Sequence, residues 1–277
     1  MGILLSTRNI FIGVITVFLV VSAVFFRDSL SRMLAFRPDS VRHAPDVIGE
    51  RITDVSVDAA DGPGTNEQAA LTEIPREISP YTGRNPAEIR PLPEEIKLFS
   101  EEQLEKLYST IGIHARAVRE NPLFFNGWIQ IGILKKVIGD FEGARDAWEY
   151  AGVIEPLNSL SFANLGELYW RYLHEYEKSE LNFRISIKHK PGDPLTYISL
   201  ADLYHYSYKE KSGEADDVLI EGLGVIPGDE NLMRHLASIY EFRGEYEKSL
   251  EWWRQVAVKN PSDQSVIDKI AELANKK

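Results

Sequence analysis

The chain has 277 residues, of which 44% are hydrophobic and 10% aromatic, and its formal net charge is −11. It contains no cysteine, which excludes disulfide scaffolds, Cys-ligated zinc, iron–sulfur clusters and thiol nucleophiles. Because phosphate contacts need clustered Lys and Arg, 31 basic residues against 42 acidic ones argue against nucleic acid as the main partner.

The first predicted element is a membrane helix over residues 10–26, preceded by a short tail over residues 1–9. The run IFIGVITVFLVVSAVFF has no charged residue and is apolar on nearly every face. As a helix it is about 25 Å long, which is close to the minimum for crossing a bilayer. We therefore expect a retained signal anchor and a single-pass membrane protein.

Two features of this segment leave alternatives open. Val21-Ser22-Ala23 has the small-residue pattern that signal peptidase prefers, so cleavage near Ala23 and secretion are the alternative to an anchor. Four arginines follow the segment and only Arg8 precedes it, which by the positive-inside rule places the body in the cytoplasm. Long domains, however, translocate largely regardless of flanking charge, so the side on which the body lies stays open.

Residues 27–93 are expected to form a flexible, Pro-rich linker between the membrane segment and the body. Eight of the 14 prolines lie between Pro38 and Pro93, and stretches such as DAADGPGTNEQAA contain few large apolar side chains. Segments of this composition bury too little surface to offset the entropy of ordering. The following residues, 94–124, are expected to form a leading helix or a degenerate repeat, because EEQLEKLYSTIGIHARAVRE has a helical pattern and ends at Asn121-Pro122.

The rest of the body repeats. Four prolines, Pro156, Pro191, Pro227 and Pro261, are separated by 35, 36 and 34 residues. Large and small residues recur in the same order before each proline. The last unit shows this order at Met233, Leu236, Ala237, Tyr240, Gly244, Tyr246, Ser249, Trp253, Val256 and Pro261. The first shows it at Trp128, Ile131, Gly132, Ala144, Trp148, Ala151 and Pro156.

The period and this order of residues resemble the tetratricopeptide repeat (TPR) family, whose repeat is about 34 residues long. The resemblance covers residues 125–263, about half of the chain, and divides them into the units 125–158, 159–193, 194–229 and 230–263. It implies an all-α fold, a right-handed superhelical solenoid of antiparallel helix pairs in which neighbouring units bury a continuous core. Residues 264–277 suit a polar-backed capping helix. Lys135 stands where the family usually has Tyr, which predicts looser packing at one end of the first unit.

The resemblance also implies a concave groove lined by the first helix of each unit. The predicted partner-binding residues are Asn126, Ile129, Ile133, Lys136, Glu167, Trp170, Arg171, Asp202, His205, Tyr206, Arg234, Glu241 and Phe242. Trp170, Tyr206 and Phe242 are the main candidates, because aromatic side chains are the usual anchors of protein interfaces. The second unit has one extra residue and the third has two, between their first and second helices. Alternatively, these three side chains pack against the extra residues that follow their own helices.

The groove is expected to bind a mixed apolar peptide or helix of a protein partner. The family's carboxylate-binding groove uses Lys and Asn where Ile129 and Ile133 stand, which argues against the acidic C-terminus of a chaperone. No catalytic motif is found, so we expect no enzyme, no cofactor and no metal. The predicted function is a membrane-anchored protein-interaction scaffold or adaptor. The alternative is a non-catalytic subunit of an envelope assembly, secretion or biogenesis complex that self-associates, as a homo-oligomer, or docks by its convex face.

Overall fold

The computed structural model describes residues 77–276 of a chain that divides into two units, Met1–Glu77 and Ile78–Lys277. The predicted tail 1–9, the membrane helix 10–26 and the first part of the linker lie outside the described residues. Within the described range, no helix is both long and apolar enough to cross a membrane. The account below concerns the second unit alone.

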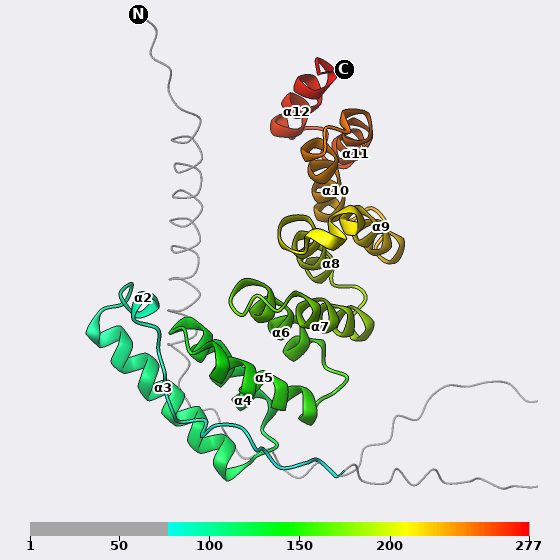
Figure 1. Cartoon of the computed structure of the whole chain (residues 1–277). Coiled ribbons are helices and arrows are strands. Elements are labelled where there is room, and N and C mark those ends of the chain that lie inside the picture. The colour runs from blue at the N-terminus through cyan, green and yellow to red at the C-terminus, as the bar shows by residue number, and fades with distance from the viewer. Residues whose placement is uncertain (1–76, 277) are drawn as a thin grey trace, which may run out of the picture. The chain divides into compact units, whose positions relative to one another are not determined.

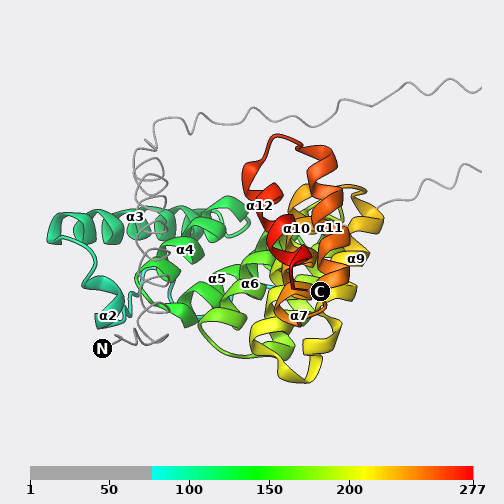
Figure 2. The ribbon, with the colours of Figure 1, turned by 90° about the horizontal axis from the view of Figure 1, so that it is seen from above.

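All regular secondary structure of the described residues is helical (Figure 1). A short helix α2 (Pro93–Ile96) precedes α3 (Glu101–Glu120), which begins at Ser100 with a capping box to Gln103. Four helix pairs follow: α4 (Phe125–Val137) with α5 (Phe141–Ile154), α6 (Ser159–Arg171) with α7 (Tyr176–His189), α8 (Pro194–Asp202) with α9 (Ala215–Val225), and α10 (Glu230–Phe242) with α11 (Tyr246–Lys259). The last helix is α12 (Gln264–Ala274), and the pairs stack in chain order (Figures 1 and 2).

The connections between pairs follow from a short recurring sequence. The second helix of each pair ends two residues before the repeat proline, which lacks the N–H group needed to continue the helix. Two residues after each proline stands an Asn or Asp whose side chain accepts a hydrogen bond from the first turn of the next helix. These capping residues are Asn158, Asp193, Asp229 and Asp263. The same few residues therefore end one helix and start the next at every connection.

Small residues let the two helices of a pair approach closely. A Cβ atom on Gly132 would lie 2.2 Å from the indole nitrogen of Trp148, and one on Gly166 would lie 2.5 Å from the ring of Phe183. In the second pair the hydroxyl of Ser179 donates a hydrogen bond of 2.7 Å to the carbonyl of Gly166. A side chain at either glycine would therefore overlap the ring of the partner helix.

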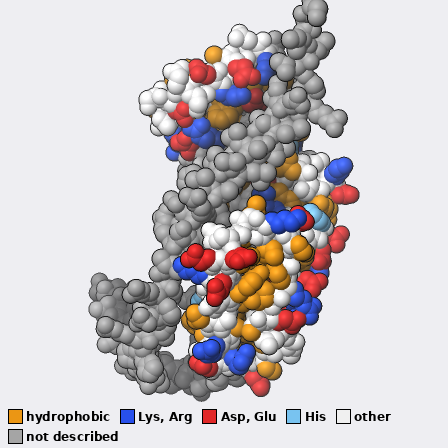
Figure 3. Space-filling model, turned by 90° about the vertical axis from the view of Figure 1, so that its left-hand side faces the viewer, with side chains coloured by type: hydrophobic (Ala, Val, Ile, Leu, Met, Phe, Trp, Pro, Cys, Tyr) orange, Lys and Arg blue, Asp and Glu red, His pale blue; other side chains and the backbone are white. Residues whose placement is uncertain are grey.

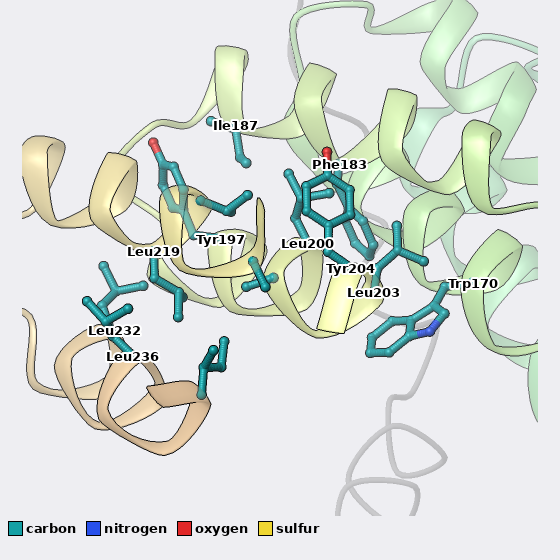
Figure 4. Packing of buried hydrophobic residues seen from close by; sticks show 14 of the residues in the cluster. Trp170, Phe183, Ile187, Tyr197, Leu200, Leu203, Tyr204, Leu219, Leu232 and Leu236 are labelled. Carbon is teal, nitrogen blue, oxygen red and sulfur yellow. The ribbon is translucent and has the colours of Figure 1, made fainter. Parts of the chain in front are cut away.

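The core is continuous from one unit to the next. Figure 4 shows its central part, in which Trp170 and Phe183 of the second pair meet Tyr197 and Leu200 of the third. Leu232 from the fourth pair completes the same cluster. Because each unit buries its apolar surface against its neighbours, stability depends on the whole array.

The third pair departs from regular helix where its two extra residues lie. After Asp202 the chain continues as a π-helix, η2 (Leu203–Ser207), and then as a 3₁₀ helix, η3 (Lys209–Glu214). The carboxylate of Glu180 on α7 accepts hydrogen bonds from the hydroxyl of Tyr204 and the ammonium group of Lys211, which fixes this segment to the preceding pair. The insertion therefore changes the shape of the first helix without interrupting the core.

The last part of the expected flexible linker is ordered, which corrects the prediction for residues 78–92, here called the N-terminal strap. The ring of Tyr81 packs against Trp128 and Tyr150, with centroids 4.5 Å and 5.1 Å apart. Burial, with a smaller contribution from Asp146, raises the pKa of Tyr81 to about 12. A Pro-rich segment too polar to fold alone is thus held by side chains that find partners on the first helix pair.

The strap also corrects the prediction that Lys135 loosens the first unit. Lys135 is 1% exposed, and its Nζ donates hydrogen bonds of 2.6 Å to the carbonyl of Glu88 and 3.1 Å to the carboxylate of Asp140. Arg84 donates a 2.7 Å hydrogen bond to the other oxygen of Asp140. The first unit therefore has a buried charge network in place of the usual tyrosine.

Burial disfavours the charged forms of Lys135 and Asp140, two members of this network. It lowers the pKa of Lys135, and this effect outweighs the opposing attraction of Asp140. Burial alone would raise the pKa of Asp140, but the hydrogen bond from Arg84 and the charge of Lys135 hold that pKa below its ordinary value. Asp140 thus remains a carboxylate at neutral pH because two cations face it.

Hydrophobic side chains also gather on one face of the body (Figure 3). Among the large apolar side chains that are exposed near the start of the described residues are Leu98, which follows α2, and Ile113 on α3.

Candidate partner-binding groove

The predicted groove residues lie on α4, α6, α8 with η2, and α10, the first helices of the four pairs. Several of them join one first helix to the next. Lys136 Nζ lies 2.8 Å from a carboxylate oxygen of Glu167, and Asp202 Oδ1 lies 2.7 Å from His235 Nε2. The last helix is joined in the same way, because Lys269 contacts Glu241 at 3.0 Å. These predicted site residues therefore already contact a neighbouring unit.

Trp170 is not an exposed anchor, contrary to expectation. Its side chain is 6% exposed, and its indole N–H donates a 2.8 Å hydrogen bond to the hydroxyl of Ser207 at the end of η2. The guanidinium of Arg171 lies 3.9 Å from the centre of the indole ring and covers it. The alternative for this tryptophan was packing against extra residues that follow its own helix. The residue that it contacts, Ser207, belongs instead to the next unit. Ile129 is also buried, in the core of the first pair.

Other predicted residues are exposed or half-buried. Asn126 is exposed and Ile133 is half-buried on α4. Arg234 on α10 is half-buried and forms 2.6 Å ion pairs with Glu230 and Asp263. Its charge is therefore already neutralised by Glu230 on its own helix and by Asp263, the N-cap residue of α12.

The remaining aromatic candidates form one exposed cluster. His205 lies between the rings of Tyr206 and Phe242, with centroid distances of 4.5 Å and 4.7 Å and edge-to-face angles. Tyr206 is 65% exposed and Phe242 is 75% exposed. Burial, together with the nearby charge of Arg243, lowers the pKa of His205, so its imidazole is neutral at pH 7.

A hollow of ≈ 240 Å³ lies between the second and third units. It is lined by Ala163, Asn164, Glu167, Arg171, Phe183, Asp193, Leu195, Thr196 and Ser199. The amide nitrogen of Asn164 is buried and has no hydrogen-bond partner among the described residues. An unpaired buried donor is costly, and because this nitrogen is screened from solvent, an acceptor in the hollow would reach it only after the Asn164 side chain rotates. Asn164 was missed by the sequence argument, whose only signal for it would have been a polar residue on an otherwise packed helix.

Within residues 77–276, no group of three or more His, Asp or Glu side chains is arranged to hold a metal ion. Asp202, which the sequence places three residues before His205, contacts His235. The groove thus offers an aromatic cluster and a donor-lined hollow, separated by charges that are paired with one another.

Comparisons with known proteins bear on the fold. No protein-family model matches the sequence, and no curated protein is significantly similar to it. A solved tetratricopeptide repeat protein from Parabacteroides merdae is 19% identical with a TM-score of 0.50, and the match covers 66% of this chain and 72% of that one. MamA is 13% identical with a TM-score of 0.49, covering 60% and 95% of the two chains. YrrB, described as a TPR protein with an unusual peptide-binding site, is 14% identical with a TM-score of 0.45, covering 61% and 85%. The body of this chain therefore has the all-α fold of tetratricopeptide repeat solenoids.

Proposed function

We propose that this protein is a non-catalytic interaction scaffold that binds a peptide or helix of a protein partner in the groove formed by its first helices. The observation that carries the proposal is the unpaired amide of Asn164 in a hollow of that groove, on the same row of helices as the exposed rings of Tyr206 and Phe242. A donor for a backbone or side-chain oxygen and apolar rings on the same row of helices are what a peptide needs for binding.

The charges of the groove support an apolar rather than a strongly ionic partner. Lys136 is paired with Glu167, and Glu241 with Lys269. Residues 94–277 carry a net charge of −9. This charge would disfavour acidic partners at long range, while short-range contacts in the groove select apolar side chains.

We further propose that residues 10–26 tether the scaffold to a membrane as a single-pass helix. The support is the uncharged run in the sequence, IFIGVITVFLVVSAVFF. Alkaline carbonate extraction of membranes, with the mass of the mature protein, tests this part. A full-length mass in the membrane pellet is expected, whereas a soluble protein lacking the residues before Ala23 or its neighbours would show cleavage.

Self-association is the second candidate, and an exposed apolar side chain on α12 favours it. Helix α12 packs against α11, and its residue Ile267 is 42% exposed. Light scattering of the purified protein separates the two proposals, because a dimer would assign this surface to a second copy and a monomer would leave the groove as the interaction site.

Replacing Asn164 by Ala is expected to weaken the affinity for a groove-binding peptide by about tenfold, since a hydrogen bond to a buried donor contributes about 1–2 kcal/mol. The measurement is a titration of the full-length protein with a labelled peptide selected on it. Asn182→Ala is the matched control, because that amide bonds only within α7, to the carbonyl of Lys178. Equal loss in both variants would contradict the groove assignment.

A further inference from the structure

The exposed aromatic cluster of the groove owes its position to an irregular helix. His205 and Tyr206 lie in η2, the π-helical continuation of α8, and Phe242 is the last residue of α10 in the next unit. π-Helical turns are rare and occur frequently at functional sites. In this protein the turn holds His205 in edge-to-face contact with Tyr206 of its own unit and with Phe242 of the next.

The charges that surround the cluster are already paired. Asp202, which precedes η2, contacts His235 at 2.7 Å. Arg243, which follows Phe242, bonds the carboxylate of Asp216 at 2.7 Å and the carbonyl of Ser212 at 2.6 Å. Glu241 is paired with Lys269. A charged ligand group would have to displace one of these partners, whereas an uncharged apolar group would displace only water from the rings.

We propose that His205, Tyr206 and Phe242 form the anchor point of the groove, and that it takes one large apolar side chain, such as Leu, Phe or Trp, from an uncharged stretch of a protein partner. This inference rests on the proposed function and specifies the chemistry of its ligand. Two rings that are 65% and 75% exposed, one unit apart, leave aromatic surface that the fold itself does not cover. The neutral imidazole between them gives edge-to-face contacts without adding charge.

The test uses the full-length protein, purified in detergent, and a random library of peptides about 12 residues long. Peptides selected on the wild type are expected to share a large apolar residue without clustered charges. Their affinity, measured by fluorescence anisotropy, is expected to fall about tenfold or more with Phe242→Ser or Tyr206→Ser. It is expected to change less than about twofold between low and high salt, because no ion pair forms on binding.

Val258→Ser is the matched control, because Val258 is 82% exposed on α11, the second helix of the same unit as Phe242. Its affinity should equal that of the wild type, and thermal unfolding of all variants shows whether they are folded. Peptides that lose affinity with Asn164→Ala but not with Phe242→Ser would overturn the anchor while supporting the proposed function. Selected peptides that carry clustered charges and bind with salt-sensitive affinity would likewise overturn the anchor while supporting the proposed function. Binding that no groove substitution changes would contradict both.

Discussion

Replacing Asp140 by Ala is expected to lower the free energy of unfolding by about 3–5 kcal/mol, the range for removing one partner of a buried ion pair. The substitution leaves the ammonium group of Lys135, 1% exposed, with a single carbonyl as its partner. It also removes the nearer of the two carboxylates that Arg84 contacts and the cap on the backbone N–H of Gly143. Urea denaturation followed by circular dichroism measures the change.

A double variant separates the buried charge from simple loss of packing. In Lys135→Met/Asp140→Ala the ammonium group is absent, so most of the loss should be recovered apart from the helix cap, which contributes about 1 kcal/mol. Asp146→Ala is the control, because that carboxylate is also bonded to Arg84 but at 3.4 Å and without Lys135. If Asp140→Ala costs no more than this control, the network does not stabilise the first unit.

Removing the N-terminal strap is expected to destabilise the first helix pair selectively. A protein that starts at residue 93 lacks the ring of Tyr81, whose burial contributes about 2 kcal/mol, and the partners that Arg84 and Glu88 provide. Because repeat arrays unfold in parts, amide exchange in α4 and α5 should increase by about 100-fold, while α10 and α11 stay protected. Hydrogen–deuterium exchange of this protein and of one that starts at residue 78 makes the comparison.

Thr82→Ala provides the matched control within the strap, since Thr82 is exposed and its loss should leave exchange unchanged. Equal exchange in the two truncated proteins would show that the strap is dispensable. The body would then begin at residue 94, as the sequence alone suggests.

The sequence predicts the repeats well because their signals are local. The proline that ends each pair and the Asn or Asp that caps the next helix stand two residues apart, so units can be delimited without tertiary information. Close helix approach could likewise be predicted at Gly132 and Gly166, where a side chain would overlap Trp148 or Phe183. All of these features depend on residues near one another in the chain or in the repeat register.

The features that the sequence does not predict depend on contacts between distant residues. Arg84 and Asp140 are 56 residues apart, and composition alone places the arginine in a spacer. Trp170 stands at a groove position, yet its indole N–H donates a hydrogen bond to the hydroxyl of Ser207, which lies 37 residues later in an insertion. The position of a residue within the repeat shows which face of its helix the residue occupies. It does not show whether that side chain already forms a hydrogen bond with a neighbouring unit. The groove that remains is therefore smaller and less charged than the register implies.

Site-specific photo-crosslinking in cells tests the central claim most directly, namely that a protein partner occupies the groove. A photoreactive phenylalanine analogue replaces Tyr206 in the full-length protein, and in a second protein it replaces Val258 on α11. The account predicts a discrete crosslinked partner from position 206, lost when Phe242 is also changed to Ser, and none from position 258. Crosslinks that form from position 258 but not from position 206 would contradict it.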